Sequence, residues 1–230
     1  MRSALVTGGS SGIGLAIARM LREEGLALTL VARTPERLEA AAAELDAVAV
    51  PADVRDDVDC ERAVAVHVER HGGLDVLVNS AGVGFMGGID EVDVKRIDLQ
   101  IDVNLRAPIL VTRAALPHLR VTRGLIVNVA SIAGTVPVPV LPVYAATKAA
   151  LISLTHSLNG ALDADGVRAH ALCPGFVDTP MASYSGLAKD EMIAPEDCAE
   201  VVRMCLRLSP HARIPQVVIE RMGSRSGDVP

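Results

Sequence analysis

The sequence is poor in aromatic residues and has no surplus of positive charge. Phe, Trp and Tyr make up 2% of the 230 residues, so few side chains are available to stack on the bases of a single-stranded nucleic acid. The formal net charge is −6, whereas binding to nucleic acid or to an anionic membrane needs clustered lysine and arginine. We therefore expect a protein that binds neither nucleic acid nor membranes.

Metal-binding and disulfide patterns are also missing. The four cysteines show no C-x-x-C pairing, which argues against a disulfide or zinc framework and favours a reducing compartment. His67 and His71 are four residues apart, but no third ligand accompanies them. We expect these histidines on a solvated face of a helix, and no metal site.

Neither a targeting segment nor a membrane span is evident. The pattern of an apolar strand begins at residue 3, without the basic region and long apolar stretch of a signal peptide. The run from Gly124 to Thr147 carries no charge, but three prolines interrupt it. We expect a cytoplasmic protein.

Short apolar runs alternate with helical patterns along the whole chain. The runs predict strands over 3–7, 28–32, 47–50, 74–78, 125–129, 167–172 and 216–219. Helical spacing predicts a helix that ends before Gly25 and others over 36–45, 57–71, 91–119, 144–163 and 196–208. This alternation indicates a doubly wound, Rossmann-like α/β fold, with a seven-stranded parallel sheet and helices on both faces. No linker divides the chain, so we expect one dinucleotide-binding and catalytic domain over 1–230, with a flexible tail over 223–230.

A glycine-rich turn separates the first predicted strand from the first predicted helix. Glycines there let the backbone approach a pyrophosphate, and the helix N-terminus offers free N–H groups. The spacing is G-x3-G-x-G, which differs from the common G-x-G-x-x-G pattern, and a turn that binds no ligand is the alternative. The residues assigned to cofactor binding in this turn are Gly8, Ser10, Ser11, Gly12, Ile13 and Gly14.

Polar corners follow the next strands at the same predicted edge of the sheet. Asp53 and Val54 follow the third strand, and Asn79, Ala81 and Gly82 follow the fourth. Ligands of α/β sheets bind outside the carboxyl ends of the strands, so we assign all five to the cofactor site.

The end of the second strand bears on the choice of cofactor. An acidic residue there would bind the ribose of NAD, but the chain has Ala32 followed by Arg33. A guanidinium suits the 2′-phosphate of NADP, so we predict NADPH as the cofactor, bound in part by Arg33. A solvated arginine without a phosphate partner is the alternative.

Tyr144 and Lys148 are four residues apart in a predicted helix, which places them on one face. A phenol is a poor acid–base group near neutral pH, and a nearby ammonium favours its phenolate form. Ser131, just past the fifth strand, can donate a hydrogen bond to a substrate oxygen. Together these residues predict general acid–base chemistry at a carbonyl.

Over essentially its whole length the chain resembles the short-chain dehydrogenase/reductase family, and its single-domain, NADP-preferring branch in particular. The resemblance rests on the glycine turn, Asp53-Val54, Asn79-Ser80-Ala81-Gly82, Asn104, Ser131, Tyr144-x3-Lys148 and Pro174-Gly175 with Thr179. The family often has Asn where Ser80 stands. The segment after Thr179 is short, and the tail Glu220-Arg221-Met222-Gly223 replaces the apolar oligomer contact of many relatives.

The resemblance implies a hydride transfer at the nicotinamide, with Tyr144 as general acid and base. It implies that Lys148 holds the nicotinamide ribose, that Ser131 polarises the carbonyl and that Asn104 positions a proton-carrying water. It also implies that Pro174, Gly175, Val177 and Thr179 cradle the nicotinamide, and that the protein forms a homodimer or homotetramer.

We therefore predict an oxidoreductase that uses NADPH to reduce a small-molecule carbonyl compound, an apolar ketone or aldehyde in the first instance. Two alternatives stay open. One is a 3-oxoacyl-thioester reductase, which the acidic net charge disfavours because its carrier is acidic too. The other is a non-catalytic NADPH-binding sensor, which would not need Ser131, Tyr144 and Lys148 together.

Overall fold

A computed structural model describes residues 1–223, apart from the side chain of Tyr184. Beyond Gly223, the predicted flexible tail lies outside the described residues. The strands are β1 (Ser3–Thr7), β2 (Ala27–Ala32), β3 (Val48–Pro51), β4 (Val76–Asn79), β5 (Leu125–Val129), β6 (Arg168–Pro174) and β7 (Gln216–Ile219). The α-helices are α1 (Gly12–Glu23), α2 (Pro35–Leu45), α3 (Asp57–His71), α4 (Val94–Ile101), α5 (Ala107–Thr122), α6 (Pro142–Ala161) and α7 (Pro195–Arg207).

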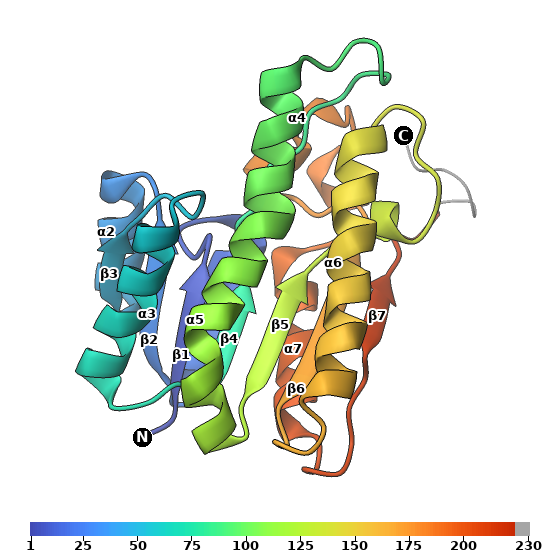
Figure 1. Ribbon diagram of the computed structural model, residues 1–230. Helices are drawn as coiled ribbons and strands as arrows, with labels where there is room; N and C mark the ends of the chain where they lie inside the picture. The colour runs from blue at the N-terminus through green and yellow to red at the C-terminus, as the bar shows by residue number, and fades with distance from the viewer. Residues whose placement is uncertain (224–230) are drawn as a thin grey trace.

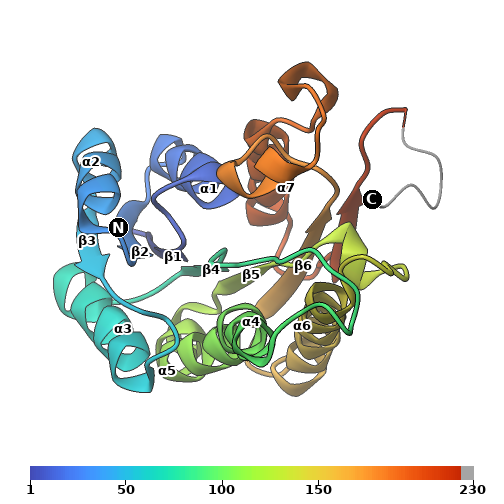
Figure 2. The same ribbon diagram turned by 90° about the horizontal axis from the view of Figure 1, so that it is seen from above.

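The strands form one parallel sheet in the order β3-β2-β1-β4-β5-β6-β7. Helices α1, α2 and α7 cover one face, and α3, α4, α5 and α6 cover the other (Figures 1 and 2). The strands β2 and β3 are added on one side of β1, and β4 to β7 are added on the other side. Doubly wound folds bind ligands at this change in strand order, between β1 and β4. The predicted α/β fold with seven parallel strands is confirmed.

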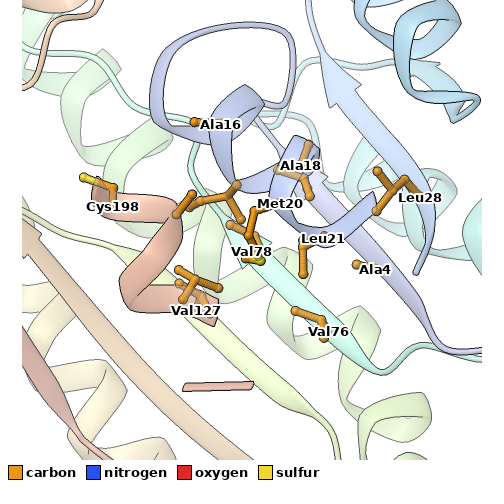
Figure 3. Close-up of a cluster of buried hydrophobic side chains, with 14 of the residues drawn as sticks. Ala4, Ala16, Ala18, Met20, Leu21, Leu28, Val76, Val78, Val127 and Cys198 are labelled. Atoms are coloured by element: carbon orange, nitrogen blue, oxygen red, sulfur yellow. The ribbon is translucent and has the colours of Figure 1, made fainter. Parts of the chain in front are cut away.

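The apolar strands are buried because helices cover them on both sides. On the first face, α1 presents Met20 and Leu21 to the sheet, and α7 adds Cys198 (Figure 3). Every residue of β1, β4 and β5 is buried. This rigid sheet fixes the strand ends from which the site is built.

The helix predicted over 91–119 is three elements instead of one. Between α4 and α5 lies a π-helical turn, Asp102–Arg106, in which the Ala107 N–H bonds to the Asp102 carbonyl five residues earlier. Pro108 accounts for the interruption, because proline has no N–H to give to the Asn104 carbonyl and its ring displaces that carbonyl.

The prediction for His67 is wrong. Its side chain is fully buried and bonds to Thr29 and Ser3, while its ring lies 4.8 Å from that of His71. His67 therefore belongs to the core between α3 and the sheet and not to a solvated face, and His71 is half-buried beside it. Among the described residues, no cluster of three or more potential metal ligands includes them.

No helix in the described part of the chain is both long and apolar enough to cross a membrane.

Candidate functional site

A cavity of about 360 Å³ lies at the carboxyl ends of the strands. Its lining joins the turn after β1, the loop after β4, the segment after β5, the start of α6 and the loop after β6. The predicted site residues that line it are Gly8, Ser11, Gly12, Ile13, Gly14, Ala81, Gly82, Ser131, Tyr144, Lys148, Pro174, Gly175, Val177 and Thr179. Residues that are distant in sequence are thus brought to one place.

The turn between β1 and α1 has room only for glycine at its critical positions. Gly8 has φ +67°, and a Cβ there would lie 2.8 Å from the Ala81 nitrogen. A Cβ on Gly14 would lie 2.4 Å from the Gly8 carbonyl oxygen. The bare backbone therefore forms the wall of the cavity at this end.

The N-terminus of α1 is suited to an anion. The Ser11 side chain makes no capping bond, and the first turn of α1 has no acidic residue. The N–H groups and the positive end of the helix dipole therefore remain to be neutralised at the cavity wall. These features fit the pyrophosphate of a dinucleotide.

The loop after β4 is tied to this turn by Thr7. Its Oγ1 accepts the N–H groups of Ser80 and Ala81, at 3.2 and 3.3 Å. It also donates to the Val78 carbonyl at 3.4 Å. One hydroxyl at the end of β1 thus fixes the position of two cavity walls.

At the other end of the cavity the structure brings Ser131, Tyr144 and Lys148 together. Lys148 Nζ lies 5.6 Å from the centre of the Tyr144 ring and donates to the Val129 carbonyl at 2.8 Å. Ser131 Oγ accepts the Ala133 N–H, which leaves its own hydrogen for an acceptor in the cavity.

A glycine allows the turn after β5 to pack closely on α6. A Cβ on Gly134 would lie 2.7 Å from the Lys148 carbonyl carbon and 2.8 Å from the Ala149 nitrogen. The 3₁₀ turn Ile132–Gly134, which follows Ser131, therefore packs directly on the backbone of α6. Only glycine at this position permits such close packing of the turn on the backbone of α6.

Burial alters the acid–base properties of the site. Lys148 is 4% exposed, and desolvation lowers the pKa of its ammonium group to about 8. Desolvation also raises the pKa of the neighbouring Cys173 thiol to about 11, so burial favours the protonated form of this cysteine. Lys148 can thus exchange a proton near neutral pH, as an acid–base site requires.

Asn104 lies outside the cavity lining and acts on the backbone. Its Oδ1 accepts the Val83 N–H at 2.9 Å, and its Nδ2 donates to the Val83 carbonyl at 2.8 Å and to Thr147 Oγ1 at 3.2 Å. Gly82 lies between Asn104 and Lys148, because a Cβ there would be 3.5 Å from Asn104 Oδ1 and 3.6 Å from Lys148 Nζ. Asn104 therefore connects the loop after β4 to α6.

Asn79 also points away from the cavity. Its Nδ2 donates to Asn128 Oδ1 at 2.8 Å and to Thr112 Oγ1 at 3.2 Å. Asn128 in turn donates to Thr155 Oγ1 at 2.9 Å. This chain of buried polar groups fixes β4 to β5 below the site, so the side chain of Asn79 supports the cavity from outside.

Four further predicted residues lie outside the lining: Ser10, Arg33, Asp53 and Val54. Arg33 is exposed, and its charge acts on Asp53. The Arg55 guanidinium bonded to Asp53 is the main cause that lowers the pKa of this carboxyl group. Val54 is buried in the core, and Ser10 is half-buried in the β1–α1 turn.

The sequence-based prediction missed part of the lining. The missed residues are Ser80, Val129, Ala130, Ile132, Ala133, Leu141, Phe176, Pro180, Met181, Ala182 and Arg221. All but Val129 lie outside the strands and α-helices, in loops or 3₁₀ turns, where no periodic pattern reveals which side chain faces inward. The unusual tail around Arg221 was a visible signal, but its place at the cavity was not predicted.

The chain resembles known proteins over nearly its whole length. A family model described as short chain dehydrogenase matches residues 2–190. An uncharacterized oxidoreductase of Staphylococcus epidermidis is 36% identical over 219 residues, covering 94% of this chain and 95% of the relative. An alcohol dehydrogenase from the archaeon Thermococcus sibiricus, complexed with 5-hydroxy-NADP, matches with TM-score 0.92 and 33% identity over 98% of both chains. A 3-ketoacyl-(acyl-carrier-protein) reductase from Brucella melitensis, complexed with NADH, matches with TM-score 0.89 and 29% identity, over 95% of this chain and 96% of the other.

Proposed function

Because the chain belongs to the short-chain dehydrogenase family of oxidoreductases, we propose that it transfers a hydride between NADPH and a carbonyl or secondary-alcohol substrate. The observation that carries this proposal is the arrangement of one cavity. Ser131, Tyr144 and Lys148 meet at one end of it, and a glycine turn with an uncapped helix N-terminus forms the other. In this arrangement the glycine turn and the N-terminus of α1 would hold the phosphates of a dinucleotide, and Tyr144 and Lys148 would lie at its nicotinamide end.

The bound cofactor supplies the hydride, and the residues of this chain handle the proton. Tyr144 donates its phenolic proton to the substrate oxygen as negative charge develops there, and it accepts the proton in the reverse reaction. Ser131 donates a hydrogen bond to the same oxygen and stabilises the developing charge. The Lys148 ammonium favours the phenolate form of Tyr144 and binds the nicotinamide ribose.

We propose NADPH as the preferred cofactor because the second strand ends in Ala32 and Arg33, with no acidic residue for the ribose. The exposed guanidinium of Arg33 can bind the 2′-phosphate in two parallel hydrogen bonds. Of the two similar structures named above, one holds an NADP derivative and the other holds NADH, so the proposed choice rests on this chain's own residues.

The test is the rate of NADPH oxidation with a panel of ketones and aldehydes. Tyr144→Phe removes only a hydroxyl, and we expect turnover to fall about 10²-fold or more while NADPH still binds. Lys148→Met should lower turnover and also weaken NADPH binding, whereas Lys95→Met, at an exposed lysine, should do neither. Near-normal turnover of the Tyr144→Phe enzyme, with an unchanged pH profile, would refute the mechanism.

A 3-oxoacyl thioester is the second candidate substrate, favoured by the similarity to the Brucella melitensis reductase. The panel should include such a thioester beside a simple ketone. A higher kcat/KM for the thioester would identify this second function.

A further inference from the structure

Arg221 gives the cavity a charge that the proton chemistry does not use. Of the residues that line the cavity, all in the described part of the chain, only Lys148 and Arg221 are cationic, and none is acidic. Lys148 is buried, with 4% of its surface exposed. Arg221 is half-exposed, so it is the charge that a molecule entering the cavity meets.

The alternation of exposed and half-buried residues in β7 continues beyond its end, and Arg221, which lines the cavity, falls on the half-buried side. Val218 and Glu220 are exposed, whereas Ile219 and Arg221 are half-buried. Ile219 packs against the hydrophobic core, and successive residues of an extended chain point to opposite faces. Glu220 therefore points to solvent, and its carboxylate is absent from the cavity lining.

The strand order places Arg221 nearer to the catalytic end than to the phosphate turn. Neighbouring strands lie about 4.8 Å apart, so β7 is about 10 Å from β5, which leads to Ser131, and about 19 Å from β1. The backbone contact agrees, because the Gly175 N–H bonds to the Ile219 carbonyl and a Cβ on Gly175 would lie 3.8 Å from the Arg221 nitrogen. The segment from Pro174 to Gly175 ends the strand between the two.

We propose that Arg221 binds a carboxylate of the substrate, so that the protein acts on oxo acids in preference to neutral ketones. This inference rests on the proposed function. A guanidinium pairs with a carboxylate through two parallel hydrogen bonds and orients the carbonyl as well as holding the molecule. Phe176, Met181 and Leu141, which also line the cavity, are apolar and suit the carbon chain of such an acid.

The experiment compares 2-oxopentanoate and 4-oxopentanoate with their methyl esters, which keep the carbonyl but lack the charge. We expect kcat/KM for at least one acid to exceed that for its ester by about tenfold or more, on the scale of a hydrogen bond to a charged group. Arg221→Met should abolish this preference while kcat/KM for the ester and KM for NADPH stay within about twofold. Arg221→Lys should retain part of the preference.

The matched control is Arg70→Met, which removes the same charge from an exposed position in the last turn of α3, outside the cavity lining. The acid preference should survive this change. Equal use of acids and esters by the unaltered protein would overturn the inference. So would an Arg221→Met enzyme with a raised KM for NADPH, since the arginine would then serve a cofactor phosphate.

A failure of the proposed function is distinguishable from a failure of this inference. If no carbonyl compound is reduced, calorimetric titration of the NADP-saturated protein with each acid and ester still measures the role of Arg221. Acid binding that weakens about tenfold in Arg221→Met supports the carboxylate site, and unchanged binding excludes it.

Discussion

His67 lies in a closed hydrogen-bond arrangement between α3 and the sheet. Its Nδ1 is 2.8 Å from Thr29 Oγ1, and its Nε2 is 3.1 Å from Ser3 Oγ. The Ser3 hydroxyl donates its own hydrogen to the Gly73 carbonyl at 2.8 Å, so it can only accept from His67. The neutral ring therefore carries its hydrogen on Nε2 and accepts the Thr29 hydroxyl at Nδ1. A second proton would bind to Nδ1 and would break the hydrogen bond that the Thr29 hydroxyl donates to this nitrogen.

Burial, together with the nearby His71, lowers the pKa of His67 to about 3 from the ordinary value of 6.5. Between these two values the unfolded chain binds the proton and the folded protein does not. The stabilising effect of neutral His67 is thus complete above pH 6.5 and is lost as the pH falls toward 3. Between pH 8 and pH 5 only the interval below 6.5, about 1.5 pH units, contributes to this loss. It lowers the free energy of unfolding by about 2 kcal/mol.

Urea unfolding followed by circular dichroism at pH 8 and pH 5 measures this loss. His67→Gln should be less stable at pH 8, because its hydrogen bonds are altered, but about 2 kcal/mol of the difference between the two pH values should disappear. His211→Gln, at an exposed histidine, should keep the full difference. An equal difference in the unaltered and His67→Gln proteins would refute the reasoning.

Three further predictions concern the cofactor, the packing and the assembly. Arg33→Ala or Ala32→Asp should reduce the preference for NADPH over NADH by about tenfold, measured as the ratio of their kcat/KM values. Gly134→Ala should cost about 1–3 kcal/mol in urea unfolding and lower kcat, because its Cβ would meet the backbone of Lys148 at 2.7 Å, whereas Gly160→Ala meets no such contact. Sedimentation velocity at micromolar concentration should show a homodimer or homotetramer, and a monomer would contradict this expectation.

The strands and most of the helices could be predicted because burial on both faces leaves a clear pattern. All seven predicted strands exist; three have the predicted bounds, and the ends of the other four differ by at most two residues. The helix over 57–71 has the predicted bounds, since Asp56 caps its first turn and Gly72 ends it in the left-handed region. Periodicity is a strong signal where a whole face of an element is apolar.

Two failures had signals in the sequence that the prediction did not use. In α3 the buried residues Cys60, Ala63, Val64 and His67 follow helical spacing, so the histidine continues an apolar face. The π turn before α5 has its signal in Pro108, whose missing N–H disturbs the helix four residues earlier. In both cases the signal is the position of one residue, His67 or Pro108, relative to its neighbours on the helix.

The candidate site could be predicted only in part, and the division has a physical cause. Residues at strand ends, such as Ser131, reach the cavity because parallel strands share one edge. Asn79 and Asn104 also follow family-like patterns, yet their side chains bind neighbouring protein groups and not the cavity. Which loop side chain turns inward, as Met181 does, depends on packing that no local pattern records.

The two ends of the cavity are mechanically connected through the loop after β4. Thr7 holds the start of that loop to the phosphate turn, and Asn104 holds Val83 by two hydrogen bonds. Asn104 also donates to Thr147, which immediately precedes Lys148 on α6. A series of hydrogen bonds therefore leads from the turn after β1 to the residue that precedes Lys148. Because every link is a hydrogen bond of a buried or half-buried group, breaking one leaves a desolvated polar atom, which favours a single rigid arrangement over several loose ones.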